Sequence, residues 1–188
     1  YQLASGLSQD VETDDNVFRQ TTARLPWLLI GMLGGIGNSM ILGNFDTTFA
    51  AHPEMALYIP LIGGTGGNVG TQSSALVVQG LANSSLDANN TWKQILKESV
   101  VALINATIIS MLVYIYNFVR FGATATVSYS VSLSLFAVVM FASIFGTLVP
   151  MTLEKLKIDP AIATGPFISI TNDIIGMMLY MGMTVLLS

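Results

Sequence analysis

The sequence predicts an all-α membrane protein with five transmembrane helices. Apolar residues make up 52% of the 188 positions and charged residues only 10%, whereas soluble domains carry about 25% charged residues. A helix needs about 20 apolar residues to cross a hydrocarbon core of roughly 30 Å, and five stretches meet this length. They lie at 25–45, 55–86, 99–119, within 121–153 and at 160–188.

A soluble helical bundle is the alternative fold, and it would need a polar face on each helix. None of the five stretches shows such a face. The chain has no cysteine, which excludes disulfides and thiolate metal sites, and it has no basic run that would suggest a nucleic-acid partner. The partner that the composition indicates is the lipid bilayer.

The basic residues predict how the helices are oriented, because loops on the cytoplasmic side carry an excess of Lys and Arg. Six of the seven precede the first stretch, separate the second from the third, or separate the fourth from the fifth. We therefore expect a multi-pass protein of the cell membrane with its N-terminus inside and its C-terminus outside. The six are Arg19, Arg24, Lys93, Lys97, Lys155 and Lys157, and the exception is Arg120.

Residues 1–23 are polar and acidic, with Asp10, Glu12, Asp14 and Asp15. They lack the glycine and the terminal glutamate of a calcium-binding loop. We expect a solvated cytoplasmic linker here and a five-helix membrane domain at 24–188. Because the chain starts at Tyr1 rather than Met, we also expect that it is a piece of a longer protein.

The second stretch has five glycines among the eight residues 63–70. Glycine costs about 1 kcal/mol in a helix interior, and unwound backbone in a membrane is tolerated where it lines a water-filled cavity. The run therefore predicts a broken helix that lines a pore, with Asn68 and Thr71 beside the break. Close helix packing through small residues is the alternative.

The fifth stretch opens with Asp159 and Pro160, the pattern of an N-cap followed by proline at the first helical position. This capping role does not exclude a second role for Asp159 at the cytoplasmic mouth of a pore. Further along, Gly165 and Pro166 are expected to weaken the helix, because proline removes a backbone hydrogen bond and clashes with the preceding turn.

Asp173 is the most informative residue, since it lies about 14 residues, roughly 21 Å, from the start of the fifth stretch. A charged residue at mid-membrane is costly, and such residues usually pair with a base or mark an ion pathway. None of the five stretches contains a Lys, Arg or His. Asp173 is therefore expected to be protonated, to face a watery cavity, or to bind an external cation. A structural alternative is a neutral Asp173 that bonds between helices. By spacing, Asn68 lies at a similar depth.

These residues resemble the membrane domain of the MgtE family of magnesium channels. The run from Gly64 to Ser73 is similar to the family's glycine-asparagine signature, and the run from Asp159 through Pro166 to Asp173 and Gly176 resembles its second signature. The resemblance covers essentially the whole chain. One departure is Gly165, where family members often carry Asn, so ion selection is expected to be looser.

The resemblance implies a homodimer with one pore on the two-fold axis, lined by the second and fifth helices of both subunits. It implies that Asp173 holds a hydrated Mg²⁺, with Asp159 near the cytoplasmic opening. It also implies cytosolic sensor domains, which these residues do not include. The candidate metal-contacting residues are Asp173, Asn68, Asp159 and Ser169. The candidate pore-lining residues are Gly66, Gly67, Gly70, Thr71, Gly165, Pro166 and Asn172.

The predicted function is a channel that passes hydrated Mg²⁺ down its electrochemical gradient into the cytoplasm. Mn²⁺, Co²⁺ or Ca²⁺ are further candidate ions. A carrier that exchanges Mg²⁺ for Na⁺ or H⁺ is the first alternative, and a membrane scaffold without transport is the second. An enzyme is not expected, because intramembrane aspartyl chemistry needs two acids at one site and the only histidine, His52, lies in an outside loop.

Overall fold

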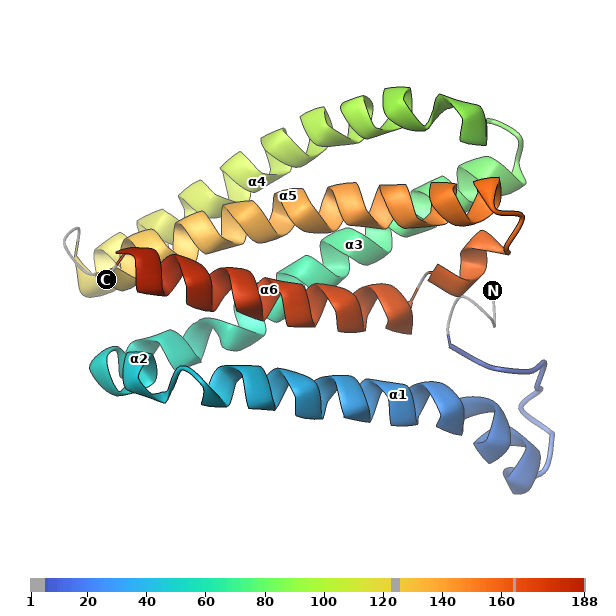
Figure 1. The fold of residues 1–188 in the computed structure, drawn as a ribbon, viewed down its shortest axis with the longest axis horizontal. Coiled ribbons are helices and arrows are strands. Elements are labelled where there is room, and N and C mark those ends of the chain that lie inside the picture. Colours follow the sequence, from blue (N-terminus) through green and yellow to red (C-terminus); the bar gives the residue numbers. More distant parts are fainter. Residues whose placement is uncertain (1–5, 123–125, 164, 188) are drawn as a thin grey trace.

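The computed structural model describes residues 6–122, 126–163 and 165–187, which form a bundle of helices (Figure 1). Within these residues there is no strand, so the all-α prediction is confirmed. The helices are α1 (Val17–Gly43), α2 (Asp46–Ala51), α3 (Ile59–Ala82), α4 (Thr91–Phe121), α5 (Thr126–Lys155) and α6 (Pro166–Leu187). Short 3₁₀ helices cover Pro53–Tyr58, Ala88–Asn90 and Pro160–Ala163.

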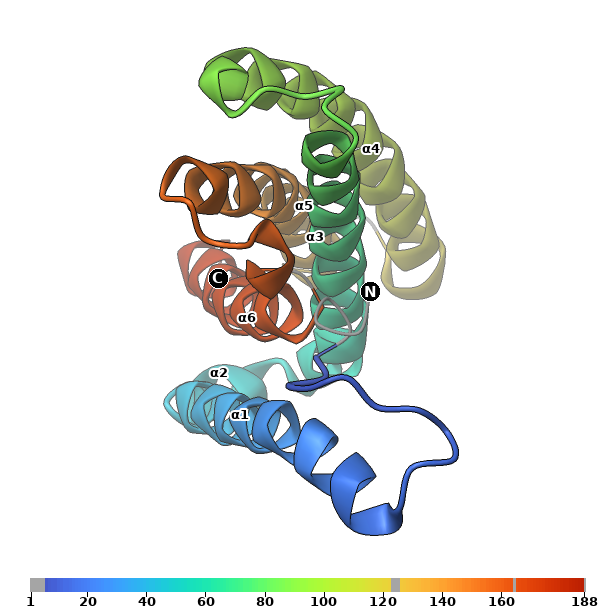
Figure 2. The same cartoon turned by 90° about the vertical axis from the view of Figure 1, so that its right-hand side faces the viewer.

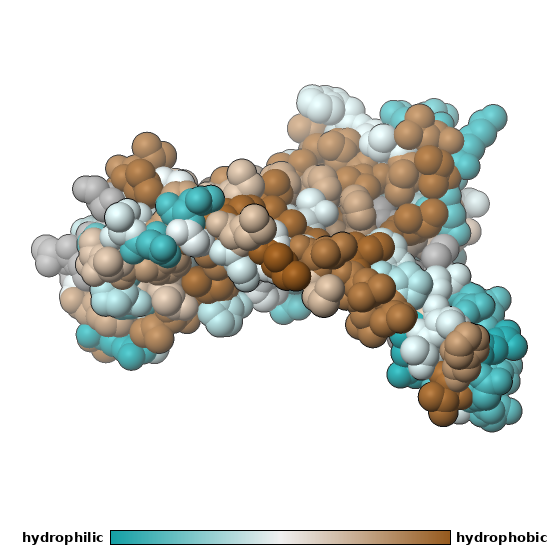
Figure 3. Space-filling view, turned by 60° about the horizontal axis from the view of Figure 1, so that its bottom comes forward, coloured by the Kyte–Doolittle hydropathy of each residue, from teal (hydrophilic) through white to brown (hydrophobic). Residues whose placement is uncertain are grey.

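Four of the helices in the described part are both long and apolar enough to cross a membrane, namely α1, α4, α5 and α6. The fifth long helix, α3, has 24 residues. It is not among the four, because its glycines and amide side chains lower its hydropathy. Many large apolar side chains on these helices are exposed, for example Leu28, Leu112 and Leu133. Figure 3 shows that apolar side chains gather in the middle of the molecule and hydrophilic ones toward its ends. A lipid environment accounts for both features.

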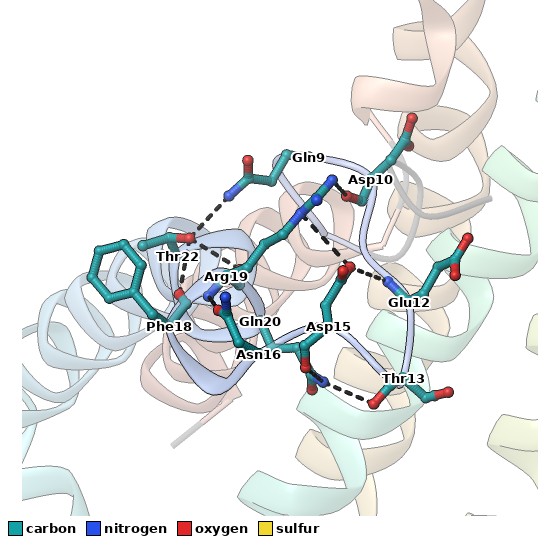
Figure 4. A network of polar contacts seen from close by, with 10 residues as sticks. All are labelled: Gln9, Asp10, Glu12, Thr13, Asp15, Asn16, Phe18, Arg19, Gln20 and Thr22. Atoms are coloured by element: carbon teal, nitrogen blue, oxygen red, sulfur yellow. Dashed lines mark hydrogen bonds and ion pairs between the residues drawn. The ribbon is translucent and has the colours of Figure 1, made fainter.

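The first helix begins at Val17, inside the segment that was expected to be a linker. Asn16 is its N-cap, and its side-chain oxygen accepts a hydrogen bond from the backbone N–H of Arg19 at 2.8 Å. Arg19 also lies 3.6 Å from Asp15 and donates to the carbonyl of Asp10 at 3.1 Å (Figure 4). These contacts fold the acidic segment back onto the start of α1.

The glycine run of the second stretch does not break the helix. Helix α3 is continuous from Ile59 to Ala82 and includes all of residues 63–70. The expectation of unwound backbone was therefore wrong. Its physical basis was the cost of glycine in an isolated helix, and neighbouring helices offset that cost here because they approach closely at Gly66 and Gly70.

The fifth stretch begins differently from the expectation. The 3₁₀ helix Pro160–Ala163 comes first, and α6 starts only at Pro166. Gly165, with φ of +59°, makes the turn between the two in a conformation that favours glycine. Proline at the first helical position loses no intrahelical hydrogen bond. Gly165 and Pro166 thus mark the start of the spanning helix and do not weaken its interior.

Helix α5 lies at the centre of the bundle and packs against α3, α4 and α6. By contrast, α1 lies to one side and contacts mainly α6 (Figure 2). At one end the core is fixed by two tyrosines. Tyr180 donates to the carbonyl of Met55 at 2.8 Å, and Tyr58 donates to Asn117 at 2.5 Å.

The ends of the helices that carry the predicted cytoplasmic residues lie at one end of the molecule. The start of α1, the connection between α3 and α4, and the connection between α5 and α6 meet on the right of Figure 1. The α2 turn and the C-terminus lie at the other end. The arrangement agrees with helices that alternate in direction, and the orientation in a membrane stays a prediction.

Candidate cation site

Asp173 lies on α6, seven residues after Pro166, which corresponds to about 10 Å along the helix axis. This is a shorter distance than the roughly 21 Å inferred from the sequence, because α6 starts at Pro166 and not at Pro160. The side chain is partly buried. Three helices meet around it, since α1 and α3 both face this part of α6.

On the α3 side, Asp173 packs against a glycine. A methyl group built on Gly63 would lie 3.2 Å from its Oδ1 atom. One turn earlier on α6, the hydroxyl of Ser169 lies 3.9 Å from the corresponding position of Gly67. Ser169 and Asp173 therefore share one face of α6, and the two glycines let that face approach α3.

On the α1 side, Asp173 faces a small cavity of about 70 Å³. Its volume is enough for a few water molecules. The residues that line this cavity with Asp173 are Gly31, Gly34, Gly35, Asn38 and Ile170. The carboxylate is thus placed between a close contact on α3 and an open space on α1.

Among the described residues, no cationic side chain pairs with Asp173. In the described residues the ion pairs are Arg19 with Asp15 and His52 with Glu54, and neither involves Asp173. No group of three His, Cys, Asp or Glu side chains converges anywhere in these residues. A single chain therefore supplies one carboxylate at this point and no complete set of charged ligands.

Asn68 is not brought to the carboxylate within one chain. It is exposed on α3, next to Gly67, so its level along the bundle is close to that of Ser169. Nothing lies within 4 Å of a methyl group built on Gly64, one turn earlier on the same open face. Ser169 precedes Asp173 by about one helical turn, so Asn68 lies about one turn from the level of Asp173, and the two side chains do not hydrogen bond in the described structure. Thr71 donates to the carbonyl of Gly67 at 2.7 Å within α3.

Two of the predicted pore-lining glycines are buried between helices. A methyl group on Gly66 would lie 2.8 Å from a methyl of Val138 on α5. At Gly70 it would collide with the amide of Asn172 on α6. Asn172 is only 1% exposed, so it lies in the contact between α3 and α6 and faces away from the open surface. These positions match the packing alternative.

Asp159 lies at the mouth of the bundle, where α5 and α6 are joined. It is exposed, and its Oδ1 atom accepts a hydrogen bond from the backbone N–H of Ala161 at 3.0 Å. The predicted capping role is confirmed, although the helix that it caps is the 3₁₀ helix and not α6. Pro166 lies beside the N-terminal segment, since a methyl group on Gly6 would be 2.6 Å from its ring.

The sequence reasoning missed the contribution of α1. Gly31, Gly34, Gly35 and Asn38 were not among the candidate residues, yet all four line the cavity beside Asp173. The available signal was an asparagine within an apolar stretch, three or four residues after a pair of glycines. It also missed Gly63, which belongs to the noted glycine run but was not singled out.

Comparison with known proteins identifies the family. Residues 59–183 match the sequence model of MgtE, described as a divalent cation transporter. Three curated relatives are named magnesium transporter MgtE. The relative from Bacillus subtilis is 30% identical over 97% of this chain and 40% of its own length. The Thermus thermophilus relative is 33% identical over 88% of this chain and 36% of its own length. The Enterococcus faecalis relative is 29% identical over 90% of this chain and 37% of its own length.

This chain therefore spans about two fifths of the length of the curated relatives that it matches. The matched region includes α3, α5 and most of α6, and with them the faces of α3 and α6 that meet at Asp173. Together with the apolar helices, the match shows that this chain is a multi-pass membrane protein and belongs to the MgtE family of divalent cation transporters.

Proposed function

We propose that this chain forms the pore of a channel that passes hydrated Mg²⁺ into the cytoplasm. The single observation that carries the proposal is Asp173, an acidic side chain within a membrane-spanning helix that has no basic partner among the described residues. Intramembrane acids of this kind mark ion pathways. The names of the three relatives support Mg²⁺ as the ion.

The ion would keep its water shell. Mg²⁺ loses water reluctantly and is usually bound through one or two carboxylates. One chain offers a single carboxylate at Asp173 and no cluster of three charged ligands within the described residues. Two copies would offer two carboxylates, which match the charge of one divalent cation. This argument supports a homodimer with Asp173 of both copies close to the two-fold axis.

The open face of α3 supports the same arrangement. Asn68 is exposed there, and a methyl group built on Gly64 would have nothing within 4 Å. A second copy seated on this face would bring the amides of Asn68 near the pore. Lipid would cover the outer helices. Any sensor domains of a longer protein would act from the end at which α1 begins.

Entry of Mg²⁺ through such a channel needs no energy source other than the membrane potential and the Mg²⁺ gradient. An inside-negative potential contributes about 2.3 kcal/mol per charge per 100 mV, hence about twice that for a divalent ion. A carrier that exchanges Mg²⁺ for Na⁺ or H⁺ is the second candidate, because a lone intramembrane acid also suits a proton relay. Mn²⁺, Co²⁺ and Ca²⁺ carry the same charge and are the ions against which selection should be measured.

The test is Mg²⁺ uptake into liposomes that contain the protein, with the membrane potential clamped and the Na⁺ and proton gradients varied. Asp173→Asn should lower uptake by at least about tenfold, since a hydrogen bond to a charged group is worth about 1.5–3 kcal/mol. Asp14→Asn, an exposed acid of the N-terminal segment, is the matched control. Uptake that follows a Na⁺ or proton gradient would favour the carrier. Wild-type Mg²⁺ uptake by Asp173→Asn would contradict both candidates.

A further inference from the structure

The cavity between α1 and α6 is lined by one polar side chain from each of the two helices. Asp173 contributes a carboxylate from α6, and Asn38 contributes a carboxamide from α1. The rest of the lining consists of three α1 glycines and Ile170. In Figure 2, α1 lies below α6 and is separated from α4 and α5. The cavity is therefore a polar space at the edge of the bundle.

One polar atom of Asn38 lacks a partner among the described residues. Its Oδ1 atom is buried and has no hydrogen-bond partner in the described structure. Burying an amide oxygen without a partner is destabilising, because the oxygen loses its hydrogen bonds to water. Water that occupies a polar cavity removes this cost when it finds two or more polar partners. Here Asn38 and Asp173 are the two side chains that offer such partners.

The α1 glycines keep this space open. A methyl group on Gly35 would meet nothing within 4 Å, so this position lines free volume. Gly34 behaves differently, because a methyl group there would lie 2.6 Å from Ile170. Gly34 therefore sets how close α1 comes to α6, and Gly35 leaves room beside the contact.

We propose that ordered water in this cavity links Asn38 to Asp173, and that Asn38 is a positioning residue for the cation site. On the α3 side the carboxylate of Asp173 packs against Gly63. The water on the α1 side would restrict rotation of the same carboxylate away from that contact. Asn38 acts through Asp173 and does not itself contact the ion. This inference rests on the proposed function, in which Asp173 faces a hydrated divalent cation.

The main test replaces the amide with an apolar group of similar size, Asn38→Leu, in the liposome assay. The ratio of Mg²⁺ to Ca²⁺ uptake should fall about tenfold, as expected for the loss of one hydrogen bond to a charged group. Asn38→Gln keeps the amide and should restore most of the ratio. An unchanged ratio in Asn38→Leu would overturn the proposal, and so would equal loss in Asn38→Gln.

A second pair of variants leaves Asn38 intact. Gly35→Ala places a methyl group in the cavity and should lower the same ratio by a smaller factor. Gly37→Ala also has nothing within 4 Å, but it does not line the cavity, so it should behave as wild type. Equal behaviour of these two variants would contradict the role of the cavity water.

An infrared measurement separates this inference from the proposed function. The carboxylate band of Asp173 can be assigned from the difference between wild type and Asp173→Asn. Asn38→Leu should shift that band, because the carboxylate loses a hydrogen-bonded water. If wild type passes no Mg²⁺, the proposed channel fails while this band still decides the inference. A band at the wild-type position in Asn38→Leu would overturn it.

Discussion

Glycine has opposite structural roles at two contacts of α3 and α6 with their neighbours. Where α3 meets α5, a methyl group on Gly146 would lie 2.7 Å from the carbonyl oxygen of Gly70, so the two backbones are in direct contact. Where α6 faces α1, a methyl group on Gly35 would meet nothing within 4 Å, and Gly35 lines the same cavity as Asp173. The first contact excludes water, and the second leaves room for it.

The difference shows that a count of small residues does not identify a pore. The α3–α5 contact uses glycine to bring helices together, which is the usual role of small residues between membrane helices. At the α1–α6 contact the same residue type leaves a polar space beside an acid. Substitutions that add one methyl group can test the two contacts separately, because the first should affect stability and the second should affect ion selection.

Gly146→Ala should have the largest effect on stability. The added methyl group meets backbone atoms of α3, which cannot rotate away, and also the side chain of Ser73 at 3.2 Å. Overpacking of this kind costs about 1–3 kcal/mol, so the melting temperature in detergent should fall clearly. Gly37→Ala is the control, since its methyl group meets nothing and alanine favours a helix by about 1 kcal/mol. A Gly146→Ala protein as stable as Gly37→Ala would contradict the close contact.

Gly63→Ala should change ion selection more than stability. Its methyl group would lie 3.2 Å from Oδ1 of Asp173, so the carboxylate must move by a few tenths of an ångström. We expect the ratio of Mg²⁺ to Ca²⁺ uptake to change severalfold while the melting temperature stays near wild type. Gly37→Ala is the control, because its methyl group would meet nothing within 4 Å and Gly37 does not line the cavity beside Asp173. Equal effects of the two variants would show that α3 does not position Asp173.

The sequence was sufficient to predict the helical fold and to single out Asp173. Long apolar stretches and a lone acid are local signals, and no long-range contact is needed to recognise them. The continuity of α3 could not be predicted in the same way. Glycine propensity favours a break, and only the contacts of Gly66 and Gly70 with other helices explain why the helix persists.

The role of α1 shows the same limit. Asn38 and Asp173 are far apart in the sequence, and the cavity that they share depends on how α1 lies against α6. Likewise, the sequence alone did not show which face of the helix carries Asn172, which was among the candidate pore-lining residues. Successive residues on a helix point about 100° apart, and here that rotation turns Asn172 toward Gly70 and buries it.

Asp159 should show the smallest effect, and it extends the comparison to the mouth of the bundle. Its carboxylate is exposed and caps the 3₁₀ helix through the N–H of Ala161. Asp159→Ala removes both the cap and the charge, whereas Asp159→Asn removes the charge and keeps a good capping group. Loss of the cap should cost about 1 kcal/mol, which is measurable as a lower melting temperature in Asp159→Ala alone.

The two variants also separate the two roles of Asp159 in transport. If the charge attracts cations to the mouth, both variants should lower Mg²⁺ uptake slightly, and the difference from wild type should shrink at high salt because exposed charges are screened. If the residue is only a cap, Asp159→Asn should transport as wild type does. Asp173→Asn should keep its effect at high salt in either case, because a partly buried charge is screened much less than an exposed one.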